Sequence, residues 1–351
     1  MKAFIGRRIL KTGVSVFCTA LICHLLHLPP TFAVITAIVT TEPTAADSLK
    51  KGLIRLPAAA MGASFAVGTF FFFGQSALSY ALVAMFTIIA CSKLKLDTGT
   101  LVATLTAVAM LPDASEHLII DFLTRISTTS IGILVSSFVN FFILPPKFGP
   151  LLVQKVEQLF KEAADHFAEM VDGHLEEKPE NSDLNQRFSA YHSLHEELTK
   201  AYQLARFQHD EWQYRRSTAF ERRSFDYLQK KLDYLQLLLI HFGKMYHLRV
   251  NRPISREEKE KIQRSVSSVR EVMHDHYHQL TTAHLSTNNV IKQLSEKQAR
   301  QNCFVSQLCH ELLSVNTVLQ ELSLITTDEH RFSLQETRYP SYIFTKANSL
   351  F

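Results

Sequence analysis

The charged residues of this 351-residue chain are distributed very unevenly, and Phe148 marks the change. Residues 1–148 contain 11 Lys and Arg and 6 Asp and Glu, whereas residues 149–351 contain 26 and 27. Long uncharged apolar stretches favour lipid, while mixed charges at short intervals favour water. We therefore predict two domains, a membrane domain at 1–148 and a cytoplasmic helical domain at 149–327, with a poorly ordered tail at 328–351.

The apolar stretches before Phe148 set the architecture of the membrane domain. A transmembrane helix needs about 20 mostly apolar residues to cross roughly 30 Å of hydrocarbon. Four stretches meet that requirement, and two shorter ones are equally apolar. We predict an all-α bundle of six transmembrane helices, at about 9–28, 31–41, 57–74, 76–92, 98–112 and 119–144. The segment 31–41 is short enough to be either a full span or a broken helix.

Basic residues test this number of spans, because cytoplasmic loops are enriched in Lys and Arg. With six spans and a cytoplasmic N-terminus, the basic residues between the spans lie on the cytoplasmic side: Lys2, Arg7, Arg8, Lys50, Lys51, Arg55, Lys93, Lys95 and Lys147. The opposite connections include the acidic stretch at 112–116. We therefore expect a multi-pass protein of the cell membrane whose N- and C-termini are both cytoplasmic.

The second half has the periodicity of amphipathic helices, with apolar residues three and four positions apart. A capping box from Ser255 to Glu258 marks one helix start, and a helix is predicted at about 288–326. We predict a cytoplasmic bundle of four or five helices. Only Gly149, Gly173 and Gly243 occur in this half, so it lacks a glycine-rich loop for nucleotide phosphates. Direct use of ATP is therefore not expected.

Metal, cofactor and nucleic-acid functions find little support. His274 with His278, and His192 with His195, have helix-face spacing, but no third ligand is fixed by the sequence. We predict no metal site and no cofactor. Nucleic acid is not an expected partner, because the second half carries a net charge of −1 and contains no recognisable reader motif.

The sequence from Thr40 to Thr44 combines a proline, a carboxylate and three hydroxyls at the end of a short apolar segment. Broken short helices leave backbone groups unpaired, and transporters often place their binding sites there. Thr40, Thr41, Glu42 and Thr44 are therefore candidate substrate-pathway residues, although a simple interfacial turn accounts for the pattern equally well. Arg55 is a further candidate, and its alternative is an ordinary basic flank of a cytoplasmic helix end.

A second candidate pair lies near the outer end of the last predicted span. Arg125 follows Asp121 by four residues, which places both side chains on one face of a helix. Arg125 either pairs with Asp121 at the interface or contacts an anionic substrate. Asn140 lies deeper in the same span, where a single polar group often forms only a hydrogen bond between helices.

These residues carry a resemblance to a known family. The run Val39-Thr40-Thr41-Glu42-Pro43-Thr44, followed by Ser48, Lys50, Gly52 and Arg55 and then by a helix of small residues, resembles the fusaric-acid-resistance-like superfamily. More closely, the chain is similar to the aromatic acid exporter family, in its Gram-positive branch with a C-terminal cytoplasmic helical domain. The resemblance implies export of aromatic or amphipathic organic acids. Here Leu56-Pro57-Ala58 follows Arg55, where relatives often have a glycine.

The sequence contains no nucleophile, base and orienting group in a recognisable set, so we do not expect an enzyme. The favoured function is efflux of small organic anions through the lipid bilayer without direct use of ATP. One six-span unit is small for a complete pathway, which favours a homodimer. The alternative is a membrane-anchored helical scaffold or sensor without transport activity.

Overall fold

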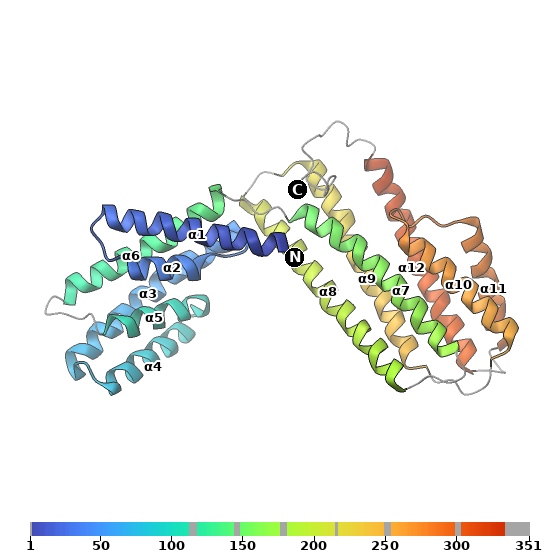
Figure 1. Cartoon of the computed structure of the whole chain (residues 1–351), viewed down its shortest axis with the longest axis horizontal. Coiled ribbons are helices and arrows are strands. Elements are labelled where there is room, and N and C mark those ends of the chain that lie inside the picture. Colours follow the sequence, from blue (N-terminus) through green and yellow to red (C-terminus); the bar gives the residue numbers. More distant parts are fainter. Residues whose placement is uncertain are drawn as a thin grey trace. The chain divides into compact units, whose positions relative to one another are not determined.

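The computed structural model describes residues 2–111, 118–143, 148–175, 181–214, 217–248, 254–298 and 303–333. Every regular element in these ranges is a helix, which confirms the all-α prediction. The chain separates into two compact units (Figure 1). Unit 1 comprises Met1–Pro146 with His209–Arg216, and unit 2 comprises Lys147–Gln208 with Ser217–Phe351. The predicted acidic connection at 112–116 lies outside the described residues.

The described residues of Met1–Pro146 in unit 1 form six α-helices. They are α1 (Lys2–Leu25), α2 (Pro30–Thr40), α3 (Ala45–Phe73), α4 (Ala77–Lys93), α5 (Thr100–Met110) and α6 (Leu118–Phe138). A 3-10 turn at Asp97–Gly99 precedes α5, and α6 continues as a π-helical turn at Val139–Ile143. Figure 1 shows α1, α2 and α6 running beside one another, and these three helices contact one another in every pairing.

The third helix begins earlier than predicted. The sequence placed its start at Pro57, but α3 starts at Ala45 and Pro57 lies inside it. Thr44 explains the early start, because its side chain accepts a hydrogen bond from Asp47 N at 3.0 Å and so caps the helix. At about 1.5 Å per residue, the 29-residue helix is roughly 43 Å long, which exceeds the hydrocarbon thickness. Its first three turns carry the charged residues.

Unit 1 has large apolar side chains outside and small or hydroxylated ones inside. Of the 33 exposed large apolar residues in the described part of the chain, 27 lie in unit 1, including Phe17, Phe71, Phe72 and Leu134 at 63–77% exposure. The buried positions are mostly Ala, Ser and Thr, for example Ala33, Ala37, Ala58, Ala63, Ala103 and Ala107. A water-soluble helical bundle has the reverse arrangement. Small residues at contacts between helices are typical of membrane bundles, where lipid covers the apolar exterior.

Glycines allow unusually close approach of backbones in this unit. A Cβ atom at Gly62 would collide with the carbonyl oxygen of Ala103, so α3 and α5 contact each other through bare backbone. A Cβ atom at Gly132 would likewise collide with Ala33 O on α2. Two helical segments, Ala45–Phe73 and Ile119–Phe142, are long and apolar enough to cross a membrane, and Ile9–Leu25, Pro30–Thr40 and Ala77–Lys93 are shorter apolar helices. The six-span count therefore stays a prediction.

Unit 2 has more helices than the predicted four or five. The described residues form α7 (Gly149–Leu175), α8 (Asn181–Tyr214), α9 (Ala219–Tyr246), α10 (Arg256–His274), α11 (Thr282–Gln298) and α12 (Cys303–Ser333). The single helix predicted at 288–326 is two helices, α11 and α12. The predicted tail is also too long, because α12 continues to Ser333. Residues 334–351 lie outside the described part of the chain.

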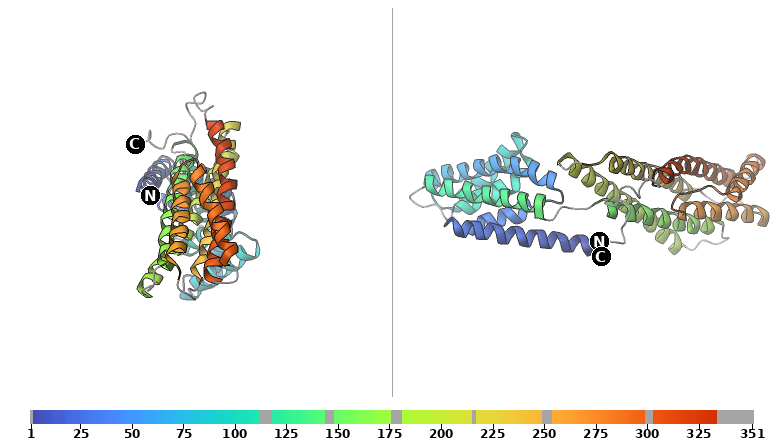
Figure 2. Two further views of the ribbon diagram at one scale, coloured as in Figure 1. Left: turned by 90° about the vertical axis from the view of Figure 1, so that its right-hand side faces the viewer. Right: turned by 90° about the horizontal axis from the view of Figure 1, so that it is seen from above.

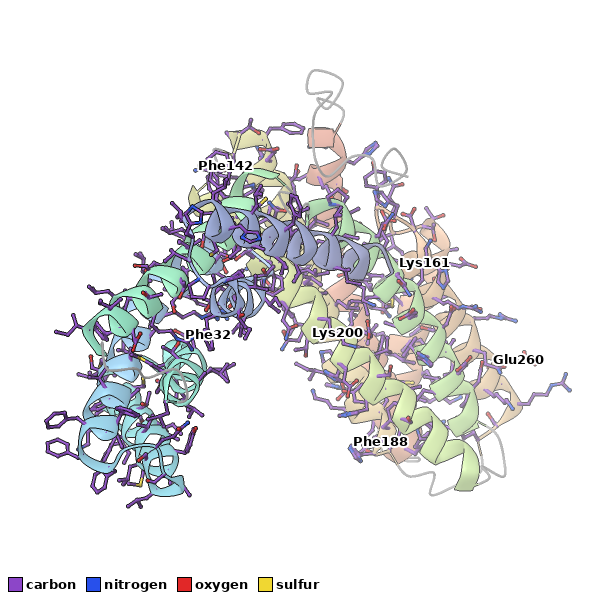
Figure 3. The ribbon with its side chains drawn as sticks, turned by 60° about the vertical axis from the view of Figure 1, so that its left-hand side comes forward. Phe32, Phe142, Lys161, Phe188, Lys200 and Glu260 are labelled. Carbon is purple, nitrogen blue, oxygen red and sulfur yellow. The ribbon has the colours of Figure 1, made fainter. Side chains whose placement is uncertain are left out.

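The core of unit 2 is large and apolar, unlike that of unit 1. Side chains from α7, α9, α10 and α12 fill it, among them Leu159, Phe167, Leu235, Val269 and Leu312. The right-hand view of Figure 2 shows the helices of this unit lying alongside one another. Lys161, Lys200 and Glu260 project away from their helices (Figure 3). The capping box from Ser255 to Glu258 is confirmed at the start of α10.

The histidines considered as metal ligands contact different neighbouring side chains in unit 2. His274 Nε2 lies 2.9 Å from Asp165 Oδ1, and the His278 ring packs 4.3 Å from the Phe160 ring. His195 Nε2 lies 2.8 Å from the Tyr191 hydroxyl. Within the described ranges, no group of three or more His, Cys, Asp or Glu side chains is arranged to hold a metal ion.

Candidate anion site at the break between α2 and α3

The polar segment between α2 and α3 is a sharp interruption of the helical backbone. α2 ends at Thr40, Thr41 is extended at φ −72° and ψ 99°, and Thr44 caps the start of α3. The Thr40 hydroxyl donates to Thr36 O at 2.7 Å, and the Thr41 hydroxyl donates to Ala37 O at 2.9 Å. These hydroxyls therefore satisfy carbonyls in the last turn of α2. The backbone is thus broken between Thr40 and Ala45, a geometry that fits both a broken transmembrane helix and an interfacial turn.

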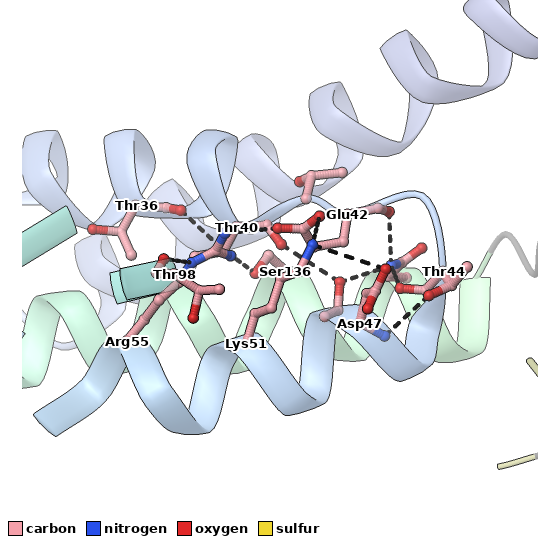
Figure 4. A network of polar contacts seen from close by, with 12 residues as sticks. Thr36, Thr40, Glu42, Thr44, Asp47, Lys51, Arg55, Thr98 and Ser136 are labelled. Carbon is pink, nitrogen blue, oxygen red and sulfur yellow. Dashed lines mark hydrogen bonds and ion pairs between the residues drawn. The ribbon is translucent and has the colours of Figure 1, made fainter. Parts of the chain in front are cut away.

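Glu42 lies in this break and contacts two cations from α3 (Figure 4). Arg55 Nη2 donates to Glu42 Oε1 at 2.6 Å, and Lys51 Nζ donates to Glu42 Oε2 at 3.0 Å. Asp47 Oδ2 lies 3.8 Å from Lys51 Nζ. Asp47, Lys51 and Arg55 are four residues apart, so their side chains share one face of α3. The cluster brings two carboxylates and two cations together on the helix face beside the break.

The Arg55 guanidinium is the most buried charge of this cluster, with a side-chain exposure of 8%. Its Nε donates to Thr98 O at 3.3 Å, just before α5. Its Nη1 is buried and has no hydrogen-bond partner among the described residues. A buried guanidinium nitrogen without an acceptor is costly, and it is available to an anionic ligand. Arg55 therefore connects α3 to the α2–α3 break and to the turn before α5. Its Nη1 is the one donor nitrogen of the guanidinium without an acceptor among the described residues.

Asn140, in the π-helical turn after α6, forms hydrogen bonds with the broken segment. Its Nδ2 donates to Thr44 O at 2.9 Å, to Glu42 O at 3.0 Å and to Ser48 Oγ at 2.7 Å. Its Oδ1 accepts a hydrogen bond from Lys11 Nζ on α1 at 2.7 Å. Asn140 is fully buried and Lys11 is 6% exposed. One amide thus holds the carbonyls of the broken segment and connects them to a buried lysine.

The candidate residues predicted from the sequence divide between two places. Arg55, Glu42, Thr40, Thr41 and Thr44 lie together at the α2–α3 break. Arg125 and Asp121 lie on α6, about four and five helical turns before Asn140. The Arg125 guanidinium is 6% exposed, lies 3.1 Å from the Phe32 ring centroid, and donates from Nη2 to Thr106 O at 3.4 Å.

Four residues of this site were not among the predicted site residues: Lys11, Asp47, Lys51 and Asn140. The spacing of Lys51 could have identified it, because it precedes Arg55 by four residues and follows Asp47 by four, which places all three on one helix face. Lys11 could also have been identified from the sequence, because it is the single charged residue in an apolar stretch. The partner of Asn140 was not predictable, because 96 residues separate it from Thr44 in the sequence.

Comparison with known proteins identifies relatives of this chain. Residues 3–143 match the family described as aromatic acid exporter family member 1. A UPF0421 protein of Halalkalibacterium halodurans is 48% identical over 97% of this chain and 95% of its own length. A UPF0421 protein of Bacillus cereus is 40% identical over 92% of this chain and 93% of its own. One from Staphylococcus haemolyticus is 34% identical over 91% and 96%. The chain belongs to the aromatic acid exporter family through residues 3–143, and over nearly all of its length it is a relative of the UPF0421 proteins.

Proposed function

We propose that this chain is a multi-pass membrane transporter that exports aromatic or amphipathic carboxylates from the cytoplasm. The proposal includes six membrane crossings, with both termini in the cytoplasm and the α2–α3 break near the cytoplasmic end. Family membership supports the substrate class. The apolar exterior and small-residue interior of unit 1 support a bilayer environment.

The short helix α2 is compatible with this topology. α2 has 11 residues, or roughly 16 Å, which is about half the hydrocarbon thickness. The extended segment after it continues in the same direction, because Phe32 contacts Arg125 and Thr44 contacts Asn140. The chain from Phe32 to Thr44 therefore runs along 15 residues of α6, or roughly 22 Å of helix. A broken helix crosses most of the bilayer where neighbouring helices shield its backbone.

The observation that carries the proposal is the buried Arg55 with its Glu42 partner and its unused Nη1. An arriving carboxylate offers the guanidinium the same bidentate acceptor geometry that Glu42 partly supplies. Glu42 retains a cation when it is displaced, because Lys51 contacts its other oxygen at 3.0 Å. Binding is then an exchange of one carboxylate for another, which avoids leaving a buried charge unpaired. Such an exchange is reversible, as a transport cycle requires.

Transport without direct use of ATP remains part of the proposal, with an ion gradient or the gradient of the acid as the driving force. The homodimer expected from the sequence also stays a prediction. The scaffold or sensor alternative requires no anion site in the membrane unit. It therefore predicts that the Arg55 cluster has no effect on permeability to acids.

The test is flux of labelled hydroxybenzoate through liposomes that contain the purified full-length protein. Wild-type protein is expected to carry the acid faster than protein-free liposomes do. Arg55→Gln should lower the rate about 10- to 100-fold, since a hydrogen bond to a charged group contributes roughly 1.5–3 kcal/mol. Lys93→Gln is the matched control, because Lys93 is an exposed cation at the end of α4. Unchanged permeability across a broad panel of acids would establish the scaffold alternative instead.

A further inference from the structure

Buried polar residues form a continuous column between α1, α2 and α6. On α1, Lys11, Ser15 and Thr19 follow one another at four-residue intervals and are 6%, 1% and 0% exposed. Phe17 and Leu21, on the opposite side of the same helix, are 68% and 48% exposed. The polar face of α1 therefore points into the unit, and its apolar face points outward.

The other two helices contribute polar residues to the same interior. Thr36 and Thr40 of α2, Ser136 of α6 and Asn140 of the π-helical turn after α6 are 0–5% exposed. The Thr40 and Ser136 hydroxyls lie 2.6 Å apart. A Cβ atom at Gly132 would come within 2.9 Å of Thr36 Cβ, so this glycine places α6 directly against α2.

The contacts between these helices fix the order of residues along the column. Going from one end to the other, α6 contacts α2 through Arg125 with Phe32, Gly132 with Thr36, and Ser136 with Thr40. α2 and α6 are therefore parallel. α1 runs in the opposite direction to α2, because only residues 26–29 connect them, and Lys11 is joined to Asn140. Each four-residue step along α1 is about one helical turn and matches a four-residue step back along α6. Ser15 therefore lies about level with Ser136, and Thr19 lies about level with Gly132.

Two hydroxyls of this column have no protein acceptor. Ser15 Oγ and Thr19 Oγ1 are buried without a hydrogen-bond partner among the described residues. A hydroxyl in an apolar helix normally donates to its own backbone, as Ser130 does to Ile126 O at 2.7 Å. A buried hydroxyl without a partner costs roughly 1–3 kcal/mol. Two of them, one turn apart on the inward face of α1, favour water or a ligand group as the missing partner.

Each end of the column carries a buried cation. Lys11 marks the end near the α2–α3 break, where Asn140 also holds Glu42 O and Thr44 O. Arg125 marks the other end, where its guanidinium covers the Phe32 ring. We propose that the α1–α2–α6 column is the translocation path for the carboxylate, seen here closed, with Lys11 and Arg125 as its inner and outer anion stations. This inference rests on the transport function proposed above, and it gives each protomer a path of its own.

Cysteine accessibility tests the path in the full-length protein reconstituted in liposomes. Cys18, Cys23, Cys91, Cys303 and Cys309 are first replaced by Ser, and acid flux through this cysteine-free protein is confirmed. Ser15→Cys and Thr19→Cys then report on the column. Phe17→Cys and Leu21→Cys are matched controls, because they lie on the outward face of α1. The probe is a membrane-impermeant, negatively charged methanethiosulfonate.

The column cysteines are expected to react at least about tenfold faster than the two controls, because the reactive thiolate forms in water and not in lipid. Hydroxybenzoate should slow their reaction, and a positively charged reagent should react more slowly than the negative one. Equal reactivity of column and control cysteines, in protein that transports the acid, would overturn the path and leave the transport function standing. Reactive column cysteines in protein that carries no acid would instead refute the transport function and retain a hydrated column.

Discussion

Arg55 and Glu42 form a buried ion pair across the break between α2 and α3, with 2.6 Å between Nη2 and Oε1. The pair joins a residue of the broken segment to the third turn of α3. Glu42 is only 13% exposed and holds Lys51 with its second oxygen. This relationship makes Glu42 an internal competitor for the guanidinium that we assign to the substrate carboxylate.

Removing that competitor should tighten binding of the acid. Glu42→Gln keeps the shape of the side chain but deletes its charge, so Arg55 loses its carboxylate partner. We expect the apparent affinity for hydroxybenzoate to rise about 3- to 10-fold, which corresponds to roughly 1 kcal/mol for the competing interaction. Concentration-dependent flux in liposomes measures this. Asp47→Asn is the control, because Asp47 contacts Lys51 and not Arg55; an equal rise in that variant would show that the effect is only one of net charge.

Gly62 should be indispensable to the packing of unit 1. Gly62→Ala introduces a Cβ against the backbone oxygen of Ala103, and overpacking of this kind costs about 1–3 kcal/mol. Gly68 lies on the same helix with nothing within 4 Å of a Cβ atom. Gly68→Ala should therefore leave stability unchanged or raise it by about 0.5–1 kcal/mol through helix propensity. Thermal unfolding in detergent compares the two variants; similar destabilisation of both would contradict the contact between α3 and α5.

Unit 2 should lose stability in mild acid because of His278. Burial lowers the pKa of this histidine to about 4, from an ordinary value of 6.5. Between these two values the unfolded chain binds a proton that the folded chain does not. The contribution of His278 is therefore fully present above about pH 6.5 and decreases by roughly 3 kcal/mol as the pH falls to about 4.

Backbone hydrogen exchange of α10–α12 in the full-length protein, corrected for the intrinsic effect of pH, measures this loss. His278→Asn retains a side chain that tolerates the φ of 48° at this position and removes the titrating group. The variant should show less loss of protection between about pH 7 and pH 5 than wild type. The same loss in both proteins would assign the acid sensitivity to other groups, such as Asp165 and Glu157, whose pKa values are lowered by their histidine partners.

Reporter fusions should place both ends of the chain in the cytoplasm. A fluorescent protein that folds only in the cytoplasm should fluoresce when fused after Phe351. A reporter that is active only outside the cell should be active when inserted at Gly74, in the turn between α3 and α4. This topology is expected because the connections on the proposed cytoplasmic side contain most of the Lys and Arg residues. External activity of the fusion after Phe351 would contradict the six-span topology.

Much of the helical architecture was predictable, because hydropathy and helical periodicity are local properties. The predicted starts of α2 and α4 lie within one residue of the observed ones. The capping box at Ser255 correctly predicted the start of α10. Pro57 misled the prediction for α3, since a proline usually marks a helix start or end, whereas Thr44 caps this helix 13 residues earlier. The site was predictable only in part. Glu42 and Arg55 were identified individually, but their pairing and the anchoring by Asn140 depend on how α3 and α6 pack.

The direct test of the anion site is a comparison of benzoate and benzamide binding to the purified full-length protein by titration calorimetry. The two probes have almost the same shape, and only benzoate carries the charge that Arg55 would pair with. We predict that benzoate binds wild type, binds Arg55→Gln at least about tenfold more weakly, and binds Lys93→Gln as it binds wild type. Equal binding of benzoate and benzamide, or benzoate binding unaffected by Arg55→Gln, would contradict the assignment of this buried guanidinium to a substrate carboxylate.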